Sequence, residues 1–331
     1  MTKVGIYGAS GYAGQDLVTL LNGHPDVDIV FGTSNTYAGE TAPGTNWAYI
    51  PHDDAPLNTV DVIFLALPHK ASAPVVKRGL DAGVRVLDLS ADLRLKTADD
   101  YTQWYGIPHP HPGLLPAPYG LPEIHRADVT ATTNAVAVPG CYPTATLLGL
   151  YPLLRQGVLA SGAPIIVDAK SGVSGAGRTP KPNTHFVEAY GNLSPYATGR
   201  SHRHVGEIEQ EINTITPNAG PVIFSPHLVP IDRGLMSSIY VTLDGLNADD
   251  AQALYEETYG NEPLVDVLPA GQQATFKHAQ SKNNCAISVT PVNGSYLHIT
   301  SVIDNLRKGA ASQAVQNFNL MFGYDETTGL I

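Results

Sequence analysis

The chain has 331 residues, enough for two domains of ordinary size with well-buried cores. Its 19 Lys and Arg against 30 Asp and Glu give a net charge of −11, which argues against nucleic acid or an anionic membrane as a partner. The sequence shows two distant cysteines, no signal peptide and no apolar span of membrane length. We therefore expect a cytoplasmic protein with no disulfide framework and no metal site.

The first residues form the pattern of a nucleotide-binding unit. Residues 3–7 predict a buried strand, residues 15–21 predict an amphipathic helix, and a turn of spacing G-x-x-G-x-x-G joins them. Glycines let such a turn close and let backbone N–H groups approach a pyrophosphate at the helix N-terminus. We expect a dinucleotide here, and the candidate contacts are Gly8, Ser10, Gly11, Tyr12, Ala13 and Gly14.

The second predicted strand, residues 27–32, ends in the polar run 33–36. No Asp or Glu stands at this strand tip to bind a ribose 2′-hydroxyl, and the small side chain of Ser34 leaves room for a 2′-phosphate. The pattern therefore favours NADP(H) over NAD(H), with Ser34 as a candidate contact.

Alternating strands and helices continue to about residue 138. Residues 61–67 and 85–90 predict strands, 71–82 a helix, and 105–122 a long surface loop, and residues 131–138 then lead into the Cys141 turn. Continuously apolar strands indicate a parallel sheet covered on both faces, and ligands of such sheets gather at the carboxyl ends of the strands. Pro68 and Arg94 lie at such ends, so Pro68 is a candidate cofactor contact. Arg94 is a candidate phosphate ligand, and it can equally be a surface or structural cation.

Cys141 occupies the predicted start of a helix. Pro143 suits the first helical turn, and residues 145–151 continue helically. Free N–H groups and the positive dipole end of a helix favour a thiolate and would also stabilise an oxyanion on a substrate carbonyl. Cys141 is therefore a candidate nucleophile, whereas a free cysteine can equally be a small buried hydrophobe. We expect that second role for Cys285.

The pattern changes after this helix. Residues 164–170, 222–230, 236–243 and 296–303 predict strands with few helices between them, which favours a mixed or antiparallel sheet in an α+β domain. A last helix over 308–322 is expected to return to the first domain. The expected organisation is a Rossmann domain of residues 1–141 plus 304–331, and a catalytic and oligomerisation domain of residues 142–303.

Residues 171–178 predict a second glycine-rich turn, one that is rich in hydroxyl groups and ends in a guanidinium. Backbone N–H groups and an arginine can together hold a phosphate or a carboxylate. Ser171, Ser174 and Arg178 are the candidate substrate contacts, and Gly175 is a candidate cofactor contact.

Five segments together resemble the N-acetyl-γ-glutamyl-phosphate reductase family, in the family's order and across nearly the whole chain: residues 8–14, 139–144, 171–178, 202–210 and 313–323. The resemblance implies NADPH-dependent reduction of N-acetyl-γ-glutamyl phosphate to N-acetyl-glutamate 5-semialdehyde in arginine biosynthesis. It also implies a Rossmann domain, a second domain like that of semialdehyde dehydrogenases, and a homotetramer or homodimer.

The resemblance also assigns roles to residues. Cys141 matches the nucleophile that forms a thioester, and His202 matches the catalytic histidine, with His204 as the alternative acid–base group. Tyr196 and Glu207 match positions that orient or assist that histidine. Histidine suits the task because its pKa lies near neutrality.

Two positions depart from the family pattern: Asn35 stands where the family often has Arg, and Gly206 where it usually has Pro. Other acyl-phosphate reductases also remain possible, namely aspartate-semialdehyde dehydrogenase or a lysine-pathway relative acting on a carrier-bound aminoadipyl phosphate. A non-catalytic NADP-binding protein would not need Cys141, His202 and Arg178 together. An alcohol dehydrogenase without a covalent step would not need the thiol.

Overall fold

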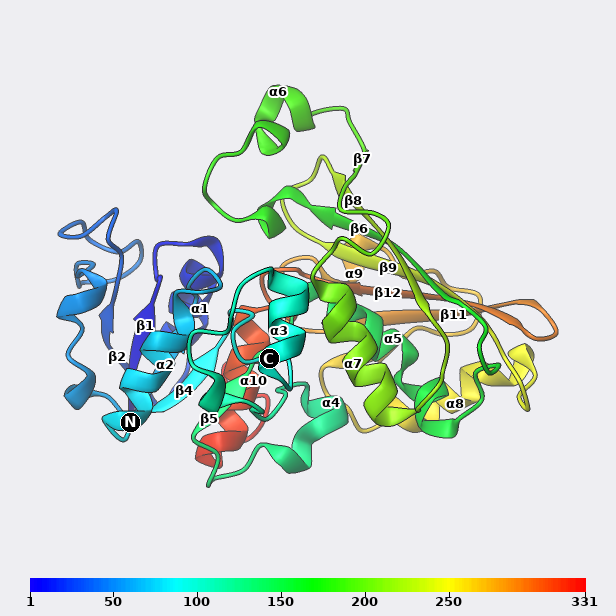
Figure 1. The fold of residues 1–331 in the computed structure, drawn as a ribbon, viewed down its shortest axis with the longest axis horizontal. Helices are drawn as coiled ribbons and strands as arrows, with labels where there is room; N and C mark the ends of the chain where they lie inside the picture. The colour runs from blue at the N-terminus through cyan, green and yellow to red at the C-terminus, as the bar shows by residue number, and fades with distance from the viewer. The chain divides into compact units, whose positions relative to one another are not determined.

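The computed structural model describes residues 1–331 and divides into two compact units. Unit 1 comprises Met1–Gly140 and Ala310–Ile331, and unit 2 comprises Cys141–Gly309 (Figure 1). The sequence analysis placed the return to the first domain at residue 304, whereas residues 304–309 belong to unit 2. The reason is local: the Asp304 carboxylate accepts the N–H of Ser281, and the Asn305 side-chain oxygen accepts the N–H of Gly234.

Unit 1 is built on a five-stranded sheet of order β2-β1-β3-β4-β5 in which every pairing is parallel. The strands are β1 (Thr2–Tyr7), β2 (Val27–Gly32), β3 (Val62–Leu65), β4 (Arg85–Asp88) and β5 (Ala135–Ala137). The helices are α1 (Tyr12–Asn22), α2 (Ser72–Asp81), α3 (Ala98–Tyr105), α4 (Pro122–His125) and α10 (Ala311–Phe322). All four residues of β3 are buried, as expected for a sheet covered on both faces.

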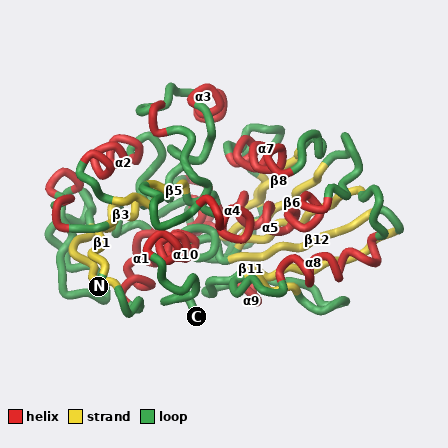
Figure 2. Tube along the Cα trace, turned by 90° about the horizontal axis from the view of Figure 1, so that it is seen from below, coloured by secondary structure: helices red, strands yellow, loops and turns green.

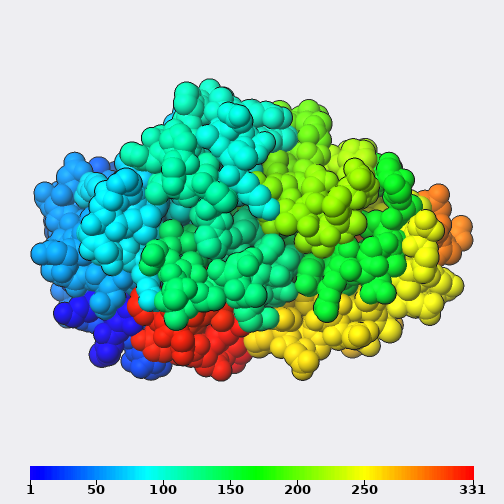
Figure 3. Space-filling view, turned by 60° about the horizontal axis from the view of Figure 1, so that its bottom comes forward, coloured from blue at the N-terminus to red at the C-terminus, as the bar shows by residue number.

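The two ends of the chain meet in unit 1. Helices α1 and α10 pack side by side (Figure 2), and in Figure 3 the C-terminal residues lie against the N-terminal ones. Gln313 and Asn317 on α10 both donate side-chain hydrogen bonds to the carbonyl of Gly120. The prediction of a surface loop over 105–122 is therefore wrong at its end, because Tyr119 forms a parallel bridge with Ala137 and is buried.

Unit 2 is built on a seven-stranded mixed sheet of order β10-β11-β12-β9-β6-β8-β7. The strands are β6 (Ile165–Gly172), β7 (Ser194–Pro195), β8 (Val222–Val229), β9 (Leu235–Thr242), β10 (Val265–Val267), β11 (Cys285–Asn293) and β12 (Tyr296–Ile303). The helices are α5 (Cys141–Gln156), α6 (Phe186–Ala189), α7 (His204–Ile215), α8 (Ala251–Tyr259) and α9 (Phe276–Ala279). The mixed sheet confirms the predicted fold class. Its helices α6, α8 and α9 were not among the predicted elements.

One face of the unit 2 sheet is covered by helices. Helix α5 packs on β9, β12, α7 and α8, and the hydroxyls of Tyr255 and Tyr259 on α8 donate to the carbonyls of Gly149 and Leu148 on α5. Cys285 is completely buried in β11, which agrees with its expected structural role. No helix of the chain has both the length and the apolar character that a membrane span requires.

Residues 177–199 leave the body of unit 2 between β6 and α7, and we call them the excursion. Figure 1 shows the excursion with α6 at its tip. Phe186, Val187 and Tyr190 are each 72% exposed there, and the rings of Phe186 and Tyr190 stack on each other. Apolar side chains of this size are rarely left so exposed in a monomeric protein.

Candidate functional site

The glycine-rich turn of unit 1 has the tight geometry that a pyrophosphate site requires. Gly8 has φ +72°, and a Cβ there would lie 2.4 Å from the carbonyl oxygen of Ala66. A Cβ on Gly14 would lie 2.2 Å from the carbonyl oxygen of Gly8. Gly11 is the N-cap of α1, and no side chain caps this helix. The turn thus presents a helix N-terminus without side chains in the way, and these residues fit a dinucleotide phosphate.

The tip of β2 lies against this turn. Ser10 Oγ donates to Ser34 Oγ over 2.8 Å, and the N–H of Tyr37 also donates to Ser34 Oγ. Ser34 is buried, so its first task is to fix the shape of the tip. Asn35 is exposed, and its side-chain oxygen accepts the N–H of His52. No basic side chain stands on the run 33–36.

The loop after β3, which carries Pro68, is held by a buried carboxylate. Asp92 accepts the N–H groups of Lys70 (2.8 Å) and Ala73 (2.9 Å), and the hydroxyl of Tyr101 over 2.9 Å. It thereby caps the N-terminus of α2 and holds Lys70 at φ +76°. Pro68 itself is exposed at the carboxyl edge of the sheet, where the sequence placed it.

Arg94, the predicted phosphate ligand, has an internal role in unit 1. Its Nε donates to the carbonyl of Val138 and its second guanidinium nitrogen to the carbonyl of Leu89. The side chain therefore joins the carboxyl ends of β4 and β5 and fixes the chain that leads to Cys141. Such a structural role is the alternative that the sequence left open for Arg94.

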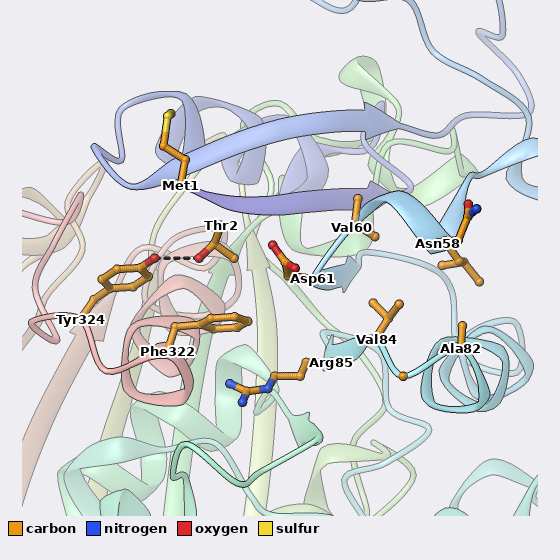
Figure 4. Close-up of a pocket in the computed structure, with 12 residues that line it drawn as sticks. Met1, Thr2, Asn58, Val60, Asp61, Ala82, Val84, Arg85, Phe322 and Tyr324 are labelled. Atoms are coloured by element: carbon orange, nitrogen blue, oxygen red, sulfur yellow. Dashed lines mark hydrogen bonds between the residues drawn. The ribbon is translucent and has the colours of Figure 1, made fainter.

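A cavity of about 500 Å³ opens at the opposite edge of the same sheet (Figure 4). Its charged groups are already engaged: Arg85 donates to two backbone carbonyls and lies over the ring of Phe322, and Asp61 accepts the N–H of Lys3. Thr2 begins β1 in this cavity, whereas Gly8 follows the strand's other end. None of the predicted site residues lines it.

In unit 2, Cys141 is the first residue of α5 and is half-buried as a free thiol. Gly309 lies directly beside it, because a Cβ on Gly309 would stand 2.8 Å from the Cβ of Cys141. The nucleophile predicted from the sequence thus stands at a helix N-terminus, as expected.

His202 lies in an aromatic cluster on the same unit. Its ring centroid is 5.5 Å from that of Tyr142, 5.6 Å from that of Tyr196, and 5.2 Å from that of Phe224. Burial, together with the nearby charge of Arg203, lowers the pKa of His202 to about 4. The imidazole is therefore neutral at neutral pH.

The backbone N–H of His204 donates to Nδ1 of His202 over 3.2 Å. This contact opposes protonation at Nδ1 and leaves Nε2 as the atom available for chemistry. His204 is the first residue of α7, and its ring lies 4.8 Å from that of His202. Glu207 lies one turn further along α7 and is buried.

Two phenols connect this cluster to Cys141. Tyr196 donates its hydroxyl proton to the hydroxyl oxygen of Tyr142 over 3.0 Å. Burial raises the pKa of both phenols, and negative charge on Cys141 raises the two values further. Tyr142 directly follows Cys141 at the start of α5, so its hydrogen bond links Tyr196 to the segment that carries the thiol. Tyr142 was not assigned a role from the sequence, although it directly follows the nucleophile.

The second glycine-rich turn follows β6. Ser171 is buried at the end of this strand, and Ser174 accepts a hydrogen bond from the side chain of Asn305 over 2.9 Å. Gly175 is exposed next to Ser171, and Arg178 is exposed at the start of the excursion. Gly175, predicted to contact the cofactor, lies in unit 2, whereas the Gly8 turn lies in unit 1.

Two family models match the chain. The model described as semialdehyde dehydrogenase, NAD binding domain, matches residues 3–132, and the model described as semialdehyde dehydrogenase, dimerisation domain, matches residues 141–305. Aspartate semialdehyde dehydrogenase II of Vibrio cholerae has a TM-score of 0.76 at 19% identity, covering 97% of this chain and 98% of that chain. The Candida albicans enzyme with NADP has a TM-score of 0.71 at 14% identity, covering 98% and 99%. The two domain models place the chain in the semialdehyde dehydrogenase class, and the solved structures share its fold.

Sequence relatives narrow the class. The N-acetyl-gamma-glutamyl-phosphate reductases of Moorella thermoacetica and Azotobacter vinelandii are 43% and 44% identical over 342 residues, and the alignments cover 100% of this chain and 98% of each relative. The chain belongs to the N-acetyl-γ-glutamyl-phosphate reductase family. The resemblance seen in the sequence, the Rossmann class of the first domain and the nicotinamide cofactor are thereby confirmed, and the protein is an oxidoreductase.

Proposed function

We propose that the protein reduces N-acetyl-γ-glutamyl phosphate to N-acetyl-glutamate 5-semialdehyde with NADPH and releases phosphate, as a step of arginine biosynthesis. Whole-length similarity to reductases named for this substrate supports the proposal. The observation that carries the chemistry is the half-buried Cys141 thiol at the N-terminus of α5, beside the Tyr142–Tyr196 pair. Both cysteines are free thiols, which suits the reducing cytoplasm.

In the first step we propose that the Cys141 sulfur attacks the acyl carbon and displaces phosphate. A carbon–sulfur bond forms and the carbon–oxygen bond to phosphate breaks. Over the whole step, the thiol proton is transferred to the departing phosphate. The positive end of α5 favours the thiolate. An acyl phosphate is already activated, so no further activation of the substrate is needed.

Negative charge then develops on the oxygen of the acyl group. His202 is the acid–base group that we propose for this oxygen, because its Nδ1 is engaged by the backbone and Nε2 remains available. His204, whose ring is 4.8 Å from that of His202, stays the alternative. We assign Glu207 and Tyr196 to positioning of this histidine, and Ser171, Ser174 and Arg178 to the phosphate or carboxylate of the substrate.

NADPH supplies the hydride when it is bound. In unit 1 we propose that the residues of the Gly8–Gly14 turn hold its pyrophosphate and that Ser10 and Ser34 lie at its ribose. Pro68 borders the same edge of the sheet. The preference for the 2′-phosphate rests on the lack of an acidic side chain on the run 33–36.

The test is phosphate-dependent NADP⁺ reduction with N-acetyl-glutamate semialdehyde, with aspartate semialdehyde offered in parallel. We expect turnover with the acetylated substrate and its loss in Cys141→Ala. Preference for aspartate semialdehyde would keep the chemistry and change the substrate. Turnover that survives Cys141→Ala would exclude the thioester, and NADP binding without turnover of either substrate would indicate a carrier-linked relative or a non-catalytic protein.

We also propose that two copies associate through the uncovered face of the unit 2 sheet. Ile223 and Tyr240 flank Ile166 in the strand register and point to the same face, and all three are exposed. Unit 2 also matches a model described as a dimerisation domain. Sedimentation velocity should show a dimer, or a tetramer built from dimers, for the natural chain and dissociation for Ile223→Lys. The same substitution at Ile331, which is 88% exposed in unit 1, is the control, and an unchanged Ile223→Lys assembly would refute this interface.

A further inference from the structure

Tyr142 lies at the centre of the candidate catalytic cluster without a role in the chemistry described above. It is 2% exposed, and its ring packs edge-on against those of His202 (5.5 Å, 89°) and Phe224 (5.1 Å, 80°). The ring of His204 lies 6.0 Å away. The ring of Tyr142 thus packs against the rings of both candidate acid–base histidines.

The hydroxyl of Tyr142 joins α5 to the excursion. It accepts the hydroxyl proton of Tyr196, which lies near the end of the excursion. Tyr142 directly follows Cys141 on the first turn of α5. One side chain therefore contacts the excursion and the histidine segment, and it belongs to the residue next to the nucleophile.

Few other contacts hold the Tyr196 end of the excursion. Its backbone N–H donates to the carbonyl of Pro226, and β7 pairs with β8 over only two residues. The tip beyond is exposed, so it adds no buried apolar contacts that would fix the position of Tyr196. The phenol–phenol hydrogen bond is thus a direct side-chain link between this segment and α5.

We propose that Tyr142 is a positioning residue that holds Tyr196 and His202 in place relative to Cys141. Its hydroxyl, and not only its ring, is needed to hold them there. The inference rests on the proposed function. A phenylalanine at this position would keep the ring packing against His202 but leave the half-buried hydroxyl of Tyr196 without its acceptor. Such a loss drives the unsatisfied group toward water and away from its native position.

The test compares Tyr142→Phe with Tyr255→Phe. The control removes another buried phenol hydroxyl from unit 2, one that donates to the Gly149 carbonyl on α5. Both variants should lose similar stability. We expect kcat of Tyr142→Phe to fall about tenfold, the value of one hydrogen bond, with KM within about twofold of the natural enzyme. Tyr255→Phe should keep kcat within about twofold.

Tyr196→Phe should reproduce the loss of kcat, and the double variant should lose no more than either single one, because both substitutions remove the same hydrogen bond. Amide hydrogen exchange of residues 194–204 should be faster in Tyr142→Phe and unchanged in Tyr255→Phe, a readout that needs no turnover. Equal kcat for Tyr142→Phe and Tyr255→Phe, or unchanged exchange of residues 194–204 in Tyr142→Phe, would overturn the inference. Lack of turnover in the natural protein would instead count against the proposed function.

Discussion

Gly309→Ala tests whether the position of Cys141 depends on the glycine beside it. An added Cβ would stand 2.8 Å from the Cβ of Cys141 and 2.7 Å from the carbonyl oxygen of Asn305, whereas ordinary contacts begin near 3.4 Å. The N–H of Gly309 is bonded to the carbonyl of Asp304, which limits relaxation of its own backbone. The first turn of α5 must then move by about 0.6 Å.

Such overpacking costs about 1–3 kcal/mol, and a displacement of about 1 Å at a reacting group can cost about a hundredfold in rate. We expect Gly309→Ala to lower kcat by roughly ten- to a hundredfold and to lower the melting temperature. The assay is NADP⁺ reduction with N-acetyl-glutamate semialdehyde, beside thermal unfolding. Gly113→Ala is the control, since nothing lies within 4 Å of a Cβ there. Natural activity and stability in Gly309→Ala would refute the reasoning.

Gly14→Ala should abolish NADPH binding by fluorescence titration because its Cβ would stand 2.2 Å from a carbonyl oxygen of the phosphate turn, whereas Gly11→Ala, with 3.4 Å, should weaken binding far less. Because the pKa of His202 is lowered to about 4, its protonation favours the unfolded chain between pH 6.5 and 4. Relative to His202→Asn, the natural protein should lose up to about 3 kcal/mol of unfolding free energy as the pH falls through that window. Urea unfolding that gives the same pH dependence of this free energy for both proteins would contradict the prediction. Asp92→Asn should cost about 2–3 kcal/mol by weakening the cap of α2, while exposed Asp81→Asn should change little.

The nucleotide-binding turn could be predicted because its parts are contiguous. Strand, glycine turn and helix follow one another within the first residues, so local pattern and spacing specify the geometry. The position of Cys141 at a helix start was predictable for the same reason, since the residues directly after it specify where the helix begins. The mixed sheet of unit 2 followed from its strand patterns.

The surroundings of Cys141 could not be predicted in the same way. The hydrogen bond from Tyr196 to Tyr142 and the packing of Phe224 on His202 join residues that the sequence separates widely. The sequence could not decide the role of Arg94, because an arginine at a strand end has the same pattern whether it binds phosphate or backbone carbonyls. Only the fold shows that the carbonyl of Val138 occupies its Nε.

The insertion of unit 2 between β5 and α10 affects the order in which the protein can fold. Unit 1 is discontinuous: its strands are synthesised first, but α10, which packs on α1, is synthesised last. At ordinary translation rates the ribosome needs roughly 10–40 s to make the intervening residues. During that interval unit 2 can fold to completion, whereas the side of α1 that will contact α10 remains without its partner helix. A nascent chain that stalls before α10 therefore contains an incompletely folded unit 1 and a fully folded unit 2. Chaperones and proteases would recognise unit 1 in such a chain.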